Sequence, residues 1–288
     1  MYKIVTDSCC DLPYTLLQEN DVDFISMVVN WDGKDYLDDL GQTFDLTHFY
    51  ASLQNGALPT TSQVNVGRYM EFFRPYVAQQ VPLLYLCFSA GLSGSYQSAL
   101  QAVALLKEEY PEAVIEVFDT KAASLGEGLM VLDTIKLKQA GKSLTETVAW
   151  LQENALSYQH WVTVDDLAHL QRGGRLSKTA AAIGGLLQVK PFLYIDTNGK
   201  LAVIGKVRGR KKALLQLATK VVESTANPSE QLILITTSGD VESAEQLKQL
   251  ILEQITPKEI RIYPMGPTIA SHTGIGCLAA ITKGPQRS

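Results

Sequence analysis

The stretch Leu83–Ala99, LLYLCFSAGLSGSYQSA, decides the fold class. Its apolar start, Leu83–Phe88, is typical of a buried strand, and the Gly- and Ser-rich turn that follows leads into a helical pattern. Further β-rich runs occur in the first half of the chain, at Tyr2–Thr6, Val22–Val29 and Val114–Phe118. Because helical patterns follow these runs, the sequence predicts an N-terminal α/β/α domain with a mainly parallel sheet.

The second half of the chain predicts antiparallel pairing instead. The runs Pro191–Thr197 and Lys200–Val207 meet at Asn198-Gly199, the pair preferred in a type I′ hairpin turn. Helices and strands then alternate, which predicts a C-terminal α+β domain with a mixed or antiparallel sheet. The expected elements are Lys211–Val222, Leu232–Thr237, Ala244–Ile255, Ile260–Tyr263 and Gly276–Ile281.

A capping box places the boundary between these domains. Ser143-Leu144-Thr145-Glu146 matches the motif and predicts a helix that runs to about Ser157, the last of the N-terminal domain. We therefore expect residues 1–157 and 158–288 to be separate domains. Since no low-complexity linker joins them, we expect rigid packing with a ligand site between them.

Composition and charge exclude several classes of function. The net charge of −5 argues against nucleic-acid binding, which needs Lys and Arg to neutralise phosphates. The apolar run around Val81–Leu92 is shorter than the ~20 residues that span a bilayer, and the start of the chain does not resemble a secretory signal. We expect a cytoplasmic protein with no integral membrane segment and no nucleic-acid partner.

Cysteine and histidine usage predicts neither a metal site nor a cofactor. The cysteines at positions 9, 10, 87 and 277 include no C-x-x-C pair, so buried, inert thiols are expected. No two of the four histidines have the i, i+4 spacing of a helical metal site. The chain also has neither a P-loop nor a G-x-G-x-x-G motif, and nucleotide binding is not predicted.

Residues Gly91–Ser95 form the first candidate site. They follow a predicted strand, which is where α/β sheets bind ligands. Glycines allow close approach of the backbone, the hydroxyls of Ser93 and Ser95 donate hydrogen bonds, and free N–H groups at a helix start favour an anion. A carboxylate or a phosphate is the expected guest. On spacing alone, a Ser-capped helix after a tight turn explains the pattern equally well.

A second hydroxyl-rich segment is Pro59–Gln63, just before the helical stretch Val66–Val77. The ordinary role of its hydroxyls is to cap the helix or form a turn. An ionised carboxylate, however, only accepts hydrogen bonds and needs several donors. Together with the Ser93 loop, this segment predicts the second side of a cup for an anion.

A serine hydrolase is the alternative from another class. Gly91-Leu92-Ser93-Gly94-Ser95 misses the G-x-S-x-G elbow only at its last position, and Ser93, Asp196 and His272 follow the hydrolase order along the chain. His272 lies in the Gly-rich segment Ala270–Gly276, which predicts a tight loop. We expect this loop to bring the imidazole close to a ligand, as a donor to an anion or as a general base.

Two clusters of basic residues have open interpretations. In Asp165–Arg175, Arg172 or Arg175 suits a phosphate clamp, whereas an Arg–Asp pair across the Gly-Gly turn is the structural alternative. Lys206–Lys212 is the strongest local positive charge, and it suits either a solvated helix start or a docking patch for an acidic partner.

Taken together, these segments resemble the DegV family over nearly the whole chain. The order and spacing of the motifs carry the resemblance, more than any single motif does. The matching segments are Thr6–Ser8, Pro59–Gln63, Leu92–Gln97, Asp119–Thr120, Leu170–Arg175, Val189–Pro191, Lys206–Gly209 and His272–Gly276.

The resemblance implies that a long-chain fatty acid lies buried between the two domains and that the chain is not an enzyme. By position, Thr61 and Ser93 resemble the main contacts of the carboxylate. Three further residues match positions close to it: Ser62, Gly94 and His272.

The resemblance also implies a partner. Family members of known role hand the fatty acid to a separate fatty acid kinase, which forms an acyl phosphate. Arg208, in Lys206–Gly209, resembles the residue that faces this kinase. A surface reserved for such a partner favours a monomer.

Overall fold

The computed structural model describes residues 2–165, 167–176 and 189–288. The apolar run Leu83–Cys87 forms β6, an inner strand of a four-stranded parallel sheet with the order β2-β1-β6-β7. Leu84 and Leu86 pack with one hydrophobic cluster and Leu83, Tyr85 and Cys87 with another. Side chains alternate across a strand, so a continuous apolar run is what a sheet covered on both faces requires. The other strands are β1 (Lys3–Asp7), β2 (Val22–Ile25) and β7 (Ile115–Asp119).

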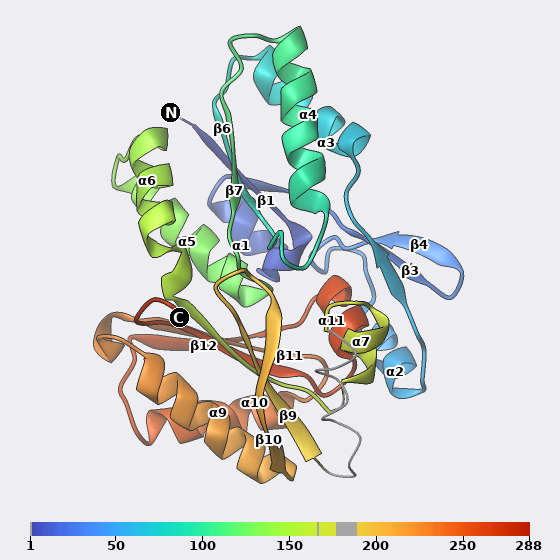
Figure 1. The fold of residues 1–288 in the computed structure, drawn as a ribbon, viewed down its shortest axis with the longest axis vertical. Helices are drawn as coiled ribbons and strands as arrows, with labels where there is room; N and C mark the ends of the chain where they lie inside the picture. Colours follow the sequence, from blue (N-terminus) through green and yellow to red (C-terminus); the bar gives the residue numbers. More distant parts are fainter. Residues whose placement is uncertain (1, 166, 177–188) are drawn as a thin grey trace.

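Helices cover both faces of this parallel sheet (Figure 1). One face carries α3 (Val66–Ala78) and α4 (Ser95–Glu109), whose apolar residues pack on Val5 of β1. The opposite face carries α1 (Tyr14–Glu19), α5 (Leu125–Gln139) and α6 (Leu144–Asn154). The predicted α/β/α arrangement is therefore confirmed.

The C-terminal half is built on a six-stranded sheet with the order β10-β9-β8-β13-β11-β12. Neighbouring strands are antiparallel except β11 and β12, so the predicted mixed sheet is confirmed. Helices α9 (Arg210–Ser224) and α10 (Val241–Leu252) pack on one face. The strands are β8 (Tyr158–Thr163), β9 (Val189–Ile195), β10 (Leu201–Arg208), β11 (Leu232–Thr237), β12 (Glu259–Pro264) and β13 (Leu278–Lys283).

A smaller layer lies against the C-terminal half beside the cavity described below. It contains a three-stranded antiparallel sheet of order β4-β3-β5 and three helices that pack on one another or on this sheet. Its strands are β3 (Val28–Trp31), β4 (Lys34–Leu37) and β5 (Thr60–Ser62), and its helices are α2 (Leu46–Gln54), α7 (Ala168–Arg172) and α11 (Pro267–Thr273).

The expected strand Val22–Val29 is wrong as a single element. It splits into β2, which ends at Ile25 in the parallel sheet, and β3, which begins at Val28 in the three-stranded sheet. The break falls where the N–H of Met27 donates to the Ser8 hydroxyl (3.0 Å) instead of to a neighbouring strand. A uniform β-rich run does not reveal such a change of partner.

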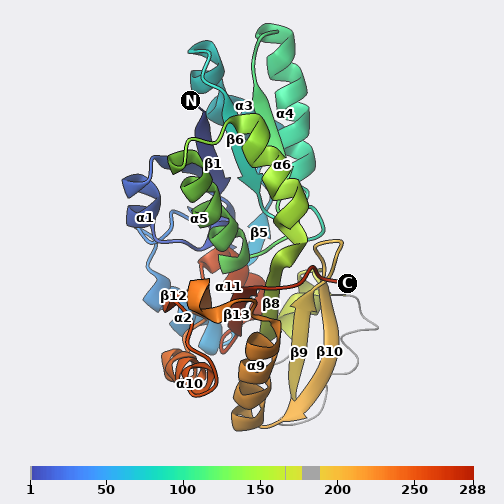
Figure 2. The same cartoon turned by 90° about the vertical axis from the view of Figure 1, so that its left-hand side faces the viewer.

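The hairpin of β9 and β10 is confirmed, but its predicted turn type is wrong. Gly199 has the positive φ of 73°, whereas Asn198 does not take the positive φ that a type I′ turn needs. The N–H of Gly199 instead donates to the carbonyl of Asp196 (3.0 Å), and the Asp196 carboxylate accepts from the N–H groups of Asn198 and Lys200 (2.9 and 2.8 Å). Figure 2 shows this turn near the C-terminus, on the side that faces the N-terminal half.

The capping box is confirmed. Ser143 accepts from the N–H of Glu146, and Glu146 accepts from the N–H of Ser143. The α-helix ends at Asn154, a 3-10 turn (Ala155–Ser157) follows, and β8 begins at Tyr158. Every described strand of the parallel sheet precedes residue 157 and every described strand of the six-stranded sheet follows it, while two separate domains stay a prediction.

Candidate functional site

The candidate site is a cavity to which both halves of the chain contribute. Its empty space, including the part open to solvent, is about 560 Å³. Apolar side chains make most of its wall. Hydroxyl, imidazole and guanidinium groups interrupt it, and we call the place where Thr61 contacts His272 the polar end. Its lining residues include Cys9, Met27, Thr61, Ser62, Phe88, Leu92, Ser93, Arg175, Ile269 and His272.

Thr61 and His272 meet at the polar end. Thr61 lies in the middle of β5, and its Oγ1 is 2.7 Å from Nε2 of His272 on α11. The two residues are 211 positions apart in the chain, so the tertiary fold alone brings them together. Both residues line the cavity, which is required if the Pro59–Gln63 segment forms one side of a cup for an anion.

The Ser93 loop forms the facing wall of the cavity. Ser93 Oγ lies 3.0 Å from Ser95 Oγ and accepts from the N–H of Ser95 (3.2 Å). Ser95 is fully buried and its hydroxyl accepts from the N–H of Val64 (3.2 Å), so this second serine holds the loop against the end of β5. Of the two hydroxyls that the loop offered, only Ser93 lines the cavity.

Gly94 lies where the two hydroxyl-rich segments come together. A Cβ at Gly94 would overlap the far end of the Gln63 side chain, so the start of α4 packs closely on the residue after β5. Ser62 also lines the cavity, with an exposed side chain. The structure therefore gathers four of the five predicted ligand residues at the cavity wall, and places Gly94 directly behind them.

The predicted loop around His272 is wrong, because this residue lies in the last turn of α11. Pro267 occupies the first turn of that helix, where its fixed φ is favourable, and Gly274 ends the helix with φ of 74°. Gly173 packs directly on the imidazole, since a Cβ there would overlap Nδ1. The ring is thus held by its own helix and by the turn after α7.

His272 is neutral at physiological pH. Burial lowers its pKa to about 4, and the nearby positive charges of Arg175 and Arg172 act in the same direction. A neutral imidazole has one donor and one acceptor nitrogen, so it can pair with Thr61 and still take part in binding. The cationic group at the cavity is therefore Arg175 and not His272.

Arg175, more than Arg172, belongs to the site. Its Nε donates to the carbonyl of Leu92 (3.0 Å), its Nη1 donates to the carbonyl of Gly173, and the guanidinium borders the cavity. Burial lowers the pKa of Arg175, which still keeps its charge at neutral pH. Arg172 is exposed, pairs with Nδ1 of His169 (2.9 Å) and does not line the cavity.

The expected Arg–Asp pair across the Gly-Gly turn is not formed by Asp165. This carboxylate pairs with Lys190 at 2.7 Å and lies 3.9 Å from Arg210. Asp166 lies outside the described residues. The two arginines beside the Gly-Gly turn therefore mark a segment that borders the cavity, but the sequence does not identify which of them lines it.

The three residues of the hydrolase alternative do not assemble. Asp196 is in the hairpin turn, where its carboxylate accepts from backbone N–H groups. His272 Nε2 faces Thr61, and Ser93 Oγ pairs with Ser95. A Ser–His–Asp relay needs consecutive hydrogen bonds between its members, and no such bond joins them in the described part of the chain.

Four buried carboxylates lie behind the apolar wall, and sequence reasoning did not single them out as a cluster. The N–H of Cys9, a lining residue, donates to Asp7 (3.0 Å), and the hydroxyl of the lining residue Thr268 donates to Asp38 (2.6 Å). Burial raises the pKa of Asp38 to about 6. We call this set the buried acids: Asp7, Asp11, Asp38 and Glu127.

Among the described residues, no group of three or more His, Cys, Asp or Glu is arranged to hold a metal ion. The four cysteines are buried free thiols, as predicted. None of the helices described in the structure combines the length and apolar character needed to span a bilayer.

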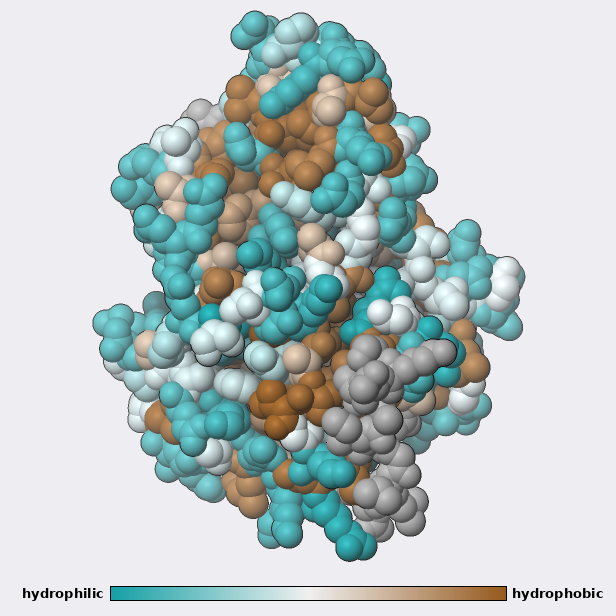
Figure 3. Space-filling view, viewed as in Figure 1, coloured by the Kyte–Doolittle hydropathy of each residue, from teal (hydrophilic) through white to brown (hydrophobic). Residues whose placement is uncertain are grey.

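Arg208 lies at the end of β10, outside the cavity lining, and its side chain is exposed. Lys206, Lys211 and Lys212 around it are exposed as well. On the face shown in Figure 3, apolar side chains gather over the neighbouring hairpin, where Ile204 is 46% exposed.

The fold and the site define an α/β protein with a parallel sheet, a mixed sheet and a mostly apolar cavity that carries hydroxyl, imidazole and guanidinium groups. The chain belongs to the DegV family, whose family model matches residues 1–283. A DegV domain-containing protein of Clostridium perfringens is 44% identical over 286 residues, which cover 99% of this chain and 98% of that protein.

Solved structures agree with this assignment. A fatty acid binding DegV family protein from Streptococcus agalactiae shares 33% identity with a TM-score of 0.86, and 99% of each chain is covered. A DegV family protein from Thermus thermophilus, described as fatty acid binding, shares 32% identity with a TM-score of 0.86 and the same coverage.

Proposed function

We propose that this chain binds a long-chain fatty acid, with the carboxylate at the polar end of the cavity and the acyl chain along the apolar wall. The observation that carries the proposal is that Thr61, Ser93 and His272 line the same mostly apolar cavity, with Thr61 and His272 in contact. The solved relatives from Streptococcus agalactiae and Thermus thermophilus, described as fatty acid binding, support it.

The two ends of the cavity match the two parts of such a ligand. A long acyl chain gains ~0.8 kcal/mol for each CH₂ that leaves water. Its carboxylate must not be left without donors, because an unpaired buried charge is costly. The hydroxyls of Thr61 and Ser93 supply neutral donors, and the guanidinium of Arg175 adds a positive charge beside them.

Binding without catalysis is the simplest role for these groups. As a donor to the carboxylate, Ser93 needs no general base, and its hydroxyl faces Ser95 instead of His272. We therefore propose a carrier and not an enzyme.

A native mass spectrum of the purified protein, followed by analysis of an organic extract of the same sample, tests the carrier role. We expect one fatty acid for each chain, or uptake of one after the lipid is stripped and re-added. Protein that is empty and takes up no fatty acid would overturn the proposal. A fluorophosphonate probe supplies the complementary test, since we expect Ser93 to stay unlabelled.

We further propose that the loaded protein presents its fatty acid to a separate fatty acid kinase through the basic segment around Arg208. The exposed cations of this segment fit an acidic partner surface, which favours charge-steered association. Arg208→Glu should weaken acyl-phosphate formation by the kinase at least ~10-fold, while the affinity for fatty acid stays unchanged. Equal loss of both would contradict a docking role for Arg208.

A further inference from the structure

The segment that carries Arg208 changes direction sharply at Gly209. This residue has φ of 88°, follows β10 and serves as the N-cap of α9 without any side-chain cap. The first turn of α9 then contains Arg210, Lys211 and Lys212 and no acidic residue. Cations at the positive end of a helix dipole are unfavourable, so contacts from outside α9 are needed to hold its start in place.

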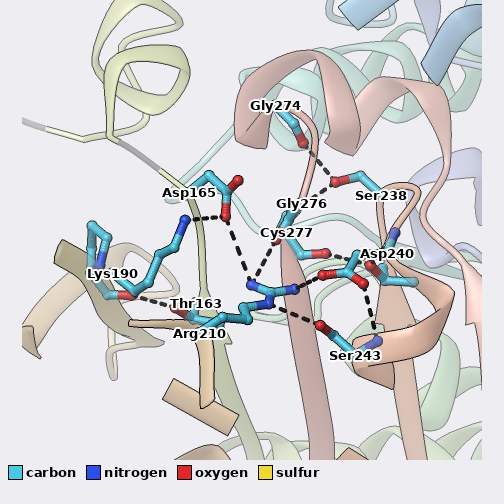
Figure 4. A network of polar contacts seen from close by, with 12 residues as sticks. Thr163, Asp165, Lys190, Arg210, Ser238, Asp240, Ser243, Gly274, Gly276 and Cys277 are labelled. Carbon is cyan, nitrogen blue, oxygen red and sulfur yellow. Dashed lines mark hydrogen bonds and ion pairs between the residues drawn. The ribbon is translucent and has the colours of Figure 1, made fainter. Parts of the chain in front are cut away.

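Arg210 is that anchor, and Figure 4 shows its contacts. Its Nη2 pairs with Asp240 (2.7 Å), its Nε donates to the hydroxyl of Ser243 (3.1 Å) and its Nη1 donates to the carbonyl of Gly276 (3.0 Å). The side chain is 22% exposed, so solvent screens these bonds only in part. A planar guanidinium with bonds in several directions fixes orientation better than a single ion pair does.

Each partner of Arg210 is itself held in place. Asp240 caps α10 by accepting from the N–H of Ser243 (3.0 Å). The loop that contains Gly276 follows α11 directly, and Ser238 fastens it by donating to the carbonyl of Gly274 (2.6 Å) and accepting from the N–H of Cys277 (2.9 Å). Figure 4 shows these contacts converging on one point of the C-terminal half.

This arrangement joins two regions that the proposed function treats separately. Gly274 and Gly276 follow His272, which lines the cavity, whereas Arg210 follows Arg208, which faces solvent. Lys206, Lys211 and Lys212, in contrast, are exposed. Arg210 is therefore the basic residue of this segment whose side chain is anchored by contacts within the protein.

We propose that Arg210 is a positioning residue: its bonds to Asp240, Ser243 and Gly276 fix the turn at Gly209 and thereby set the direction in which Arg208 faces an acidic partner surface. The inference rests on the proposed docking role of Arg208. In this view Arg210 touches neither the fatty acid nor the partner, and it acts only through the orientation of its neighbour.

The test compares Arg210→Gln, Arg210→Lys and the control Arg261→Gln in a kinase assay with fatty-acid-loaded protein. Arg261 lies on β12, at the opposite edge of the six-stranded sheet from β10, and its guanidinium also pairs with a carboxylate, that of Glu259. Arg261→Gln thus makes the same change of charge away from the segment.

We expect Arg210→Gln to raise the KM for the loaded protein about 10-fold, equivalent to about 1.4 kcal/mol, with kcat and fatty acid affinity unchanged. Arg210→Lys should restore part of the loss, because a lysine can make one of the bonds. Arg261→Gln should behave like the unaltered protein. Should Arg210→Gln fold poorly, Ser243→Ala removes a single bond and should raise KM to a smaller extent.

Other outcomes overturn the inference in distinguishable ways. An unchanged KM in Arg210→Gln, together with a raised KM in Arg208→Glu, would refute the positioning role and leave the docking role intact. A parallel loss of fatty acid affinity and kcat would make Arg210 a general structural residue. If Arg208→Glu leaves KM unchanged, the docking role fails first and the inference fails with it.

Discussion

Burial shifts pKa values in opposite directions at the polar end of the cavity and among the buried acids behind its apolar wall. At the polar end, burial and nearby arginines lower the pKa of His272 to about 4, so the ring is neutral and Arg175 supplies the positive charge. Behind the apolar wall, burial raises the pKa of Asp38 to about 6, and it raises those of Asp11 and Glu127 as well. Desolvation penalises the charged form in both places.

The difference teaches which way an anionic amphiphile should lie. A carboxylate beside Thr61 and Ser93 meets neutral donors and the charge of Arg175. A carboxylate placed beside Cys9 and Thr268 would approach Asp7 and Asp38, which lie one hydrogen bond behind these two lining residues. Like charges in a poorly solvated region repel strongly, so the two regions together favour one orientation of the ligand.

The largest expected effect comes from removing the donors of the polar end. Thr61→Val with Ser93→Ala should weaken fatty acid binding by about 3–5 kcal/mol, because each hydrogen bond to a charged group contributes about 1.5–3 kcal/mol. Isothermal titration with a saturated fatty acid measures this loss. Thr60→Val is the matched control, since neighbouring residues of a strand point to opposite faces.

The methyl ester of the same acid sharpens this prediction. The ester has no charge, so it should lose much less affinity than the acid in the double variant. Equal losses for acid and ester would mean that Thr61 and Ser93 support the shape of the cavity and do not hold a carboxylate.

The sequence predicted those features of the two regions that depend on contacts between residues close together in the chain. Local patterns predicted β6, the Ser93 loop and the capping box of α6, because strand alternation and capping act within a few residues. The inward position of Arg175, in preference to Arg172, was not predicted, because it depends on the bond from Nε of Arg175 to the carbonyl of Leu92, 83 positions away. No periodicity encodes such a contact.

The buried acids were missed for the same reason. Asp38 accepts from Thr268, 230 positions away, and the N–H of Gly266 donates to Asp11. These bonds hold the N-terminal end of α11 and so place His272 at its other end, which a pattern of single residues cannot reveal. The misassigned loop around His272 follows directly, because α11 has only seven residues and depends on these distant partners.

An intermediate effect is expected on stability as a function of pH. Asp38 has a folded pKa above its unfolded value, so its contribution is fully present below about pH 4 and is lost as pH rises through about 6. His272 has a folded pKa below its unfolded value, so its contribution is present above about pH 6.5 and is lost as pH falls through about 4. The two groups thus act with opposite signs in the same window.

Urea unfolding of the ligand-free protein across this window measures both contributions. In the unaltered protein, Asp38 lowers the free energy of unfolding as pH rises through this window, and His272 raises it. Asp38→Asn should abolish the first change and His272→Gln the second, each on the order of 2–3 kcal/mol at most. The two variants therefore serve as controls for each other. Changes of slope with the same sign would contradict the opposite electrostatic character of the two regions.

The smallest expected effect distinguishes the contribution of the acyl chain to affinity from that of the carboxylate. In a series of saturated acids of increasing length, each added CH₂ should improve affinity by about 0.8 kcal/mol, or roughly 4-fold, until the apolar wall is filled. The double variant Thr61→Val with Ser93→Ala should lower the affinity for every acid of the series without changing the slope of affinity against chain length, because the donors do not touch the chain.

Met27→Ala, in the apolar wall, should reduce this slope and leave the difference in affinity between acid and ester intact, since it removes apolar contact and no donor. If instead the double variant flattens the series, head and chain are not bound independently, and the division of the cavity into a polar and an apolar end does not hold.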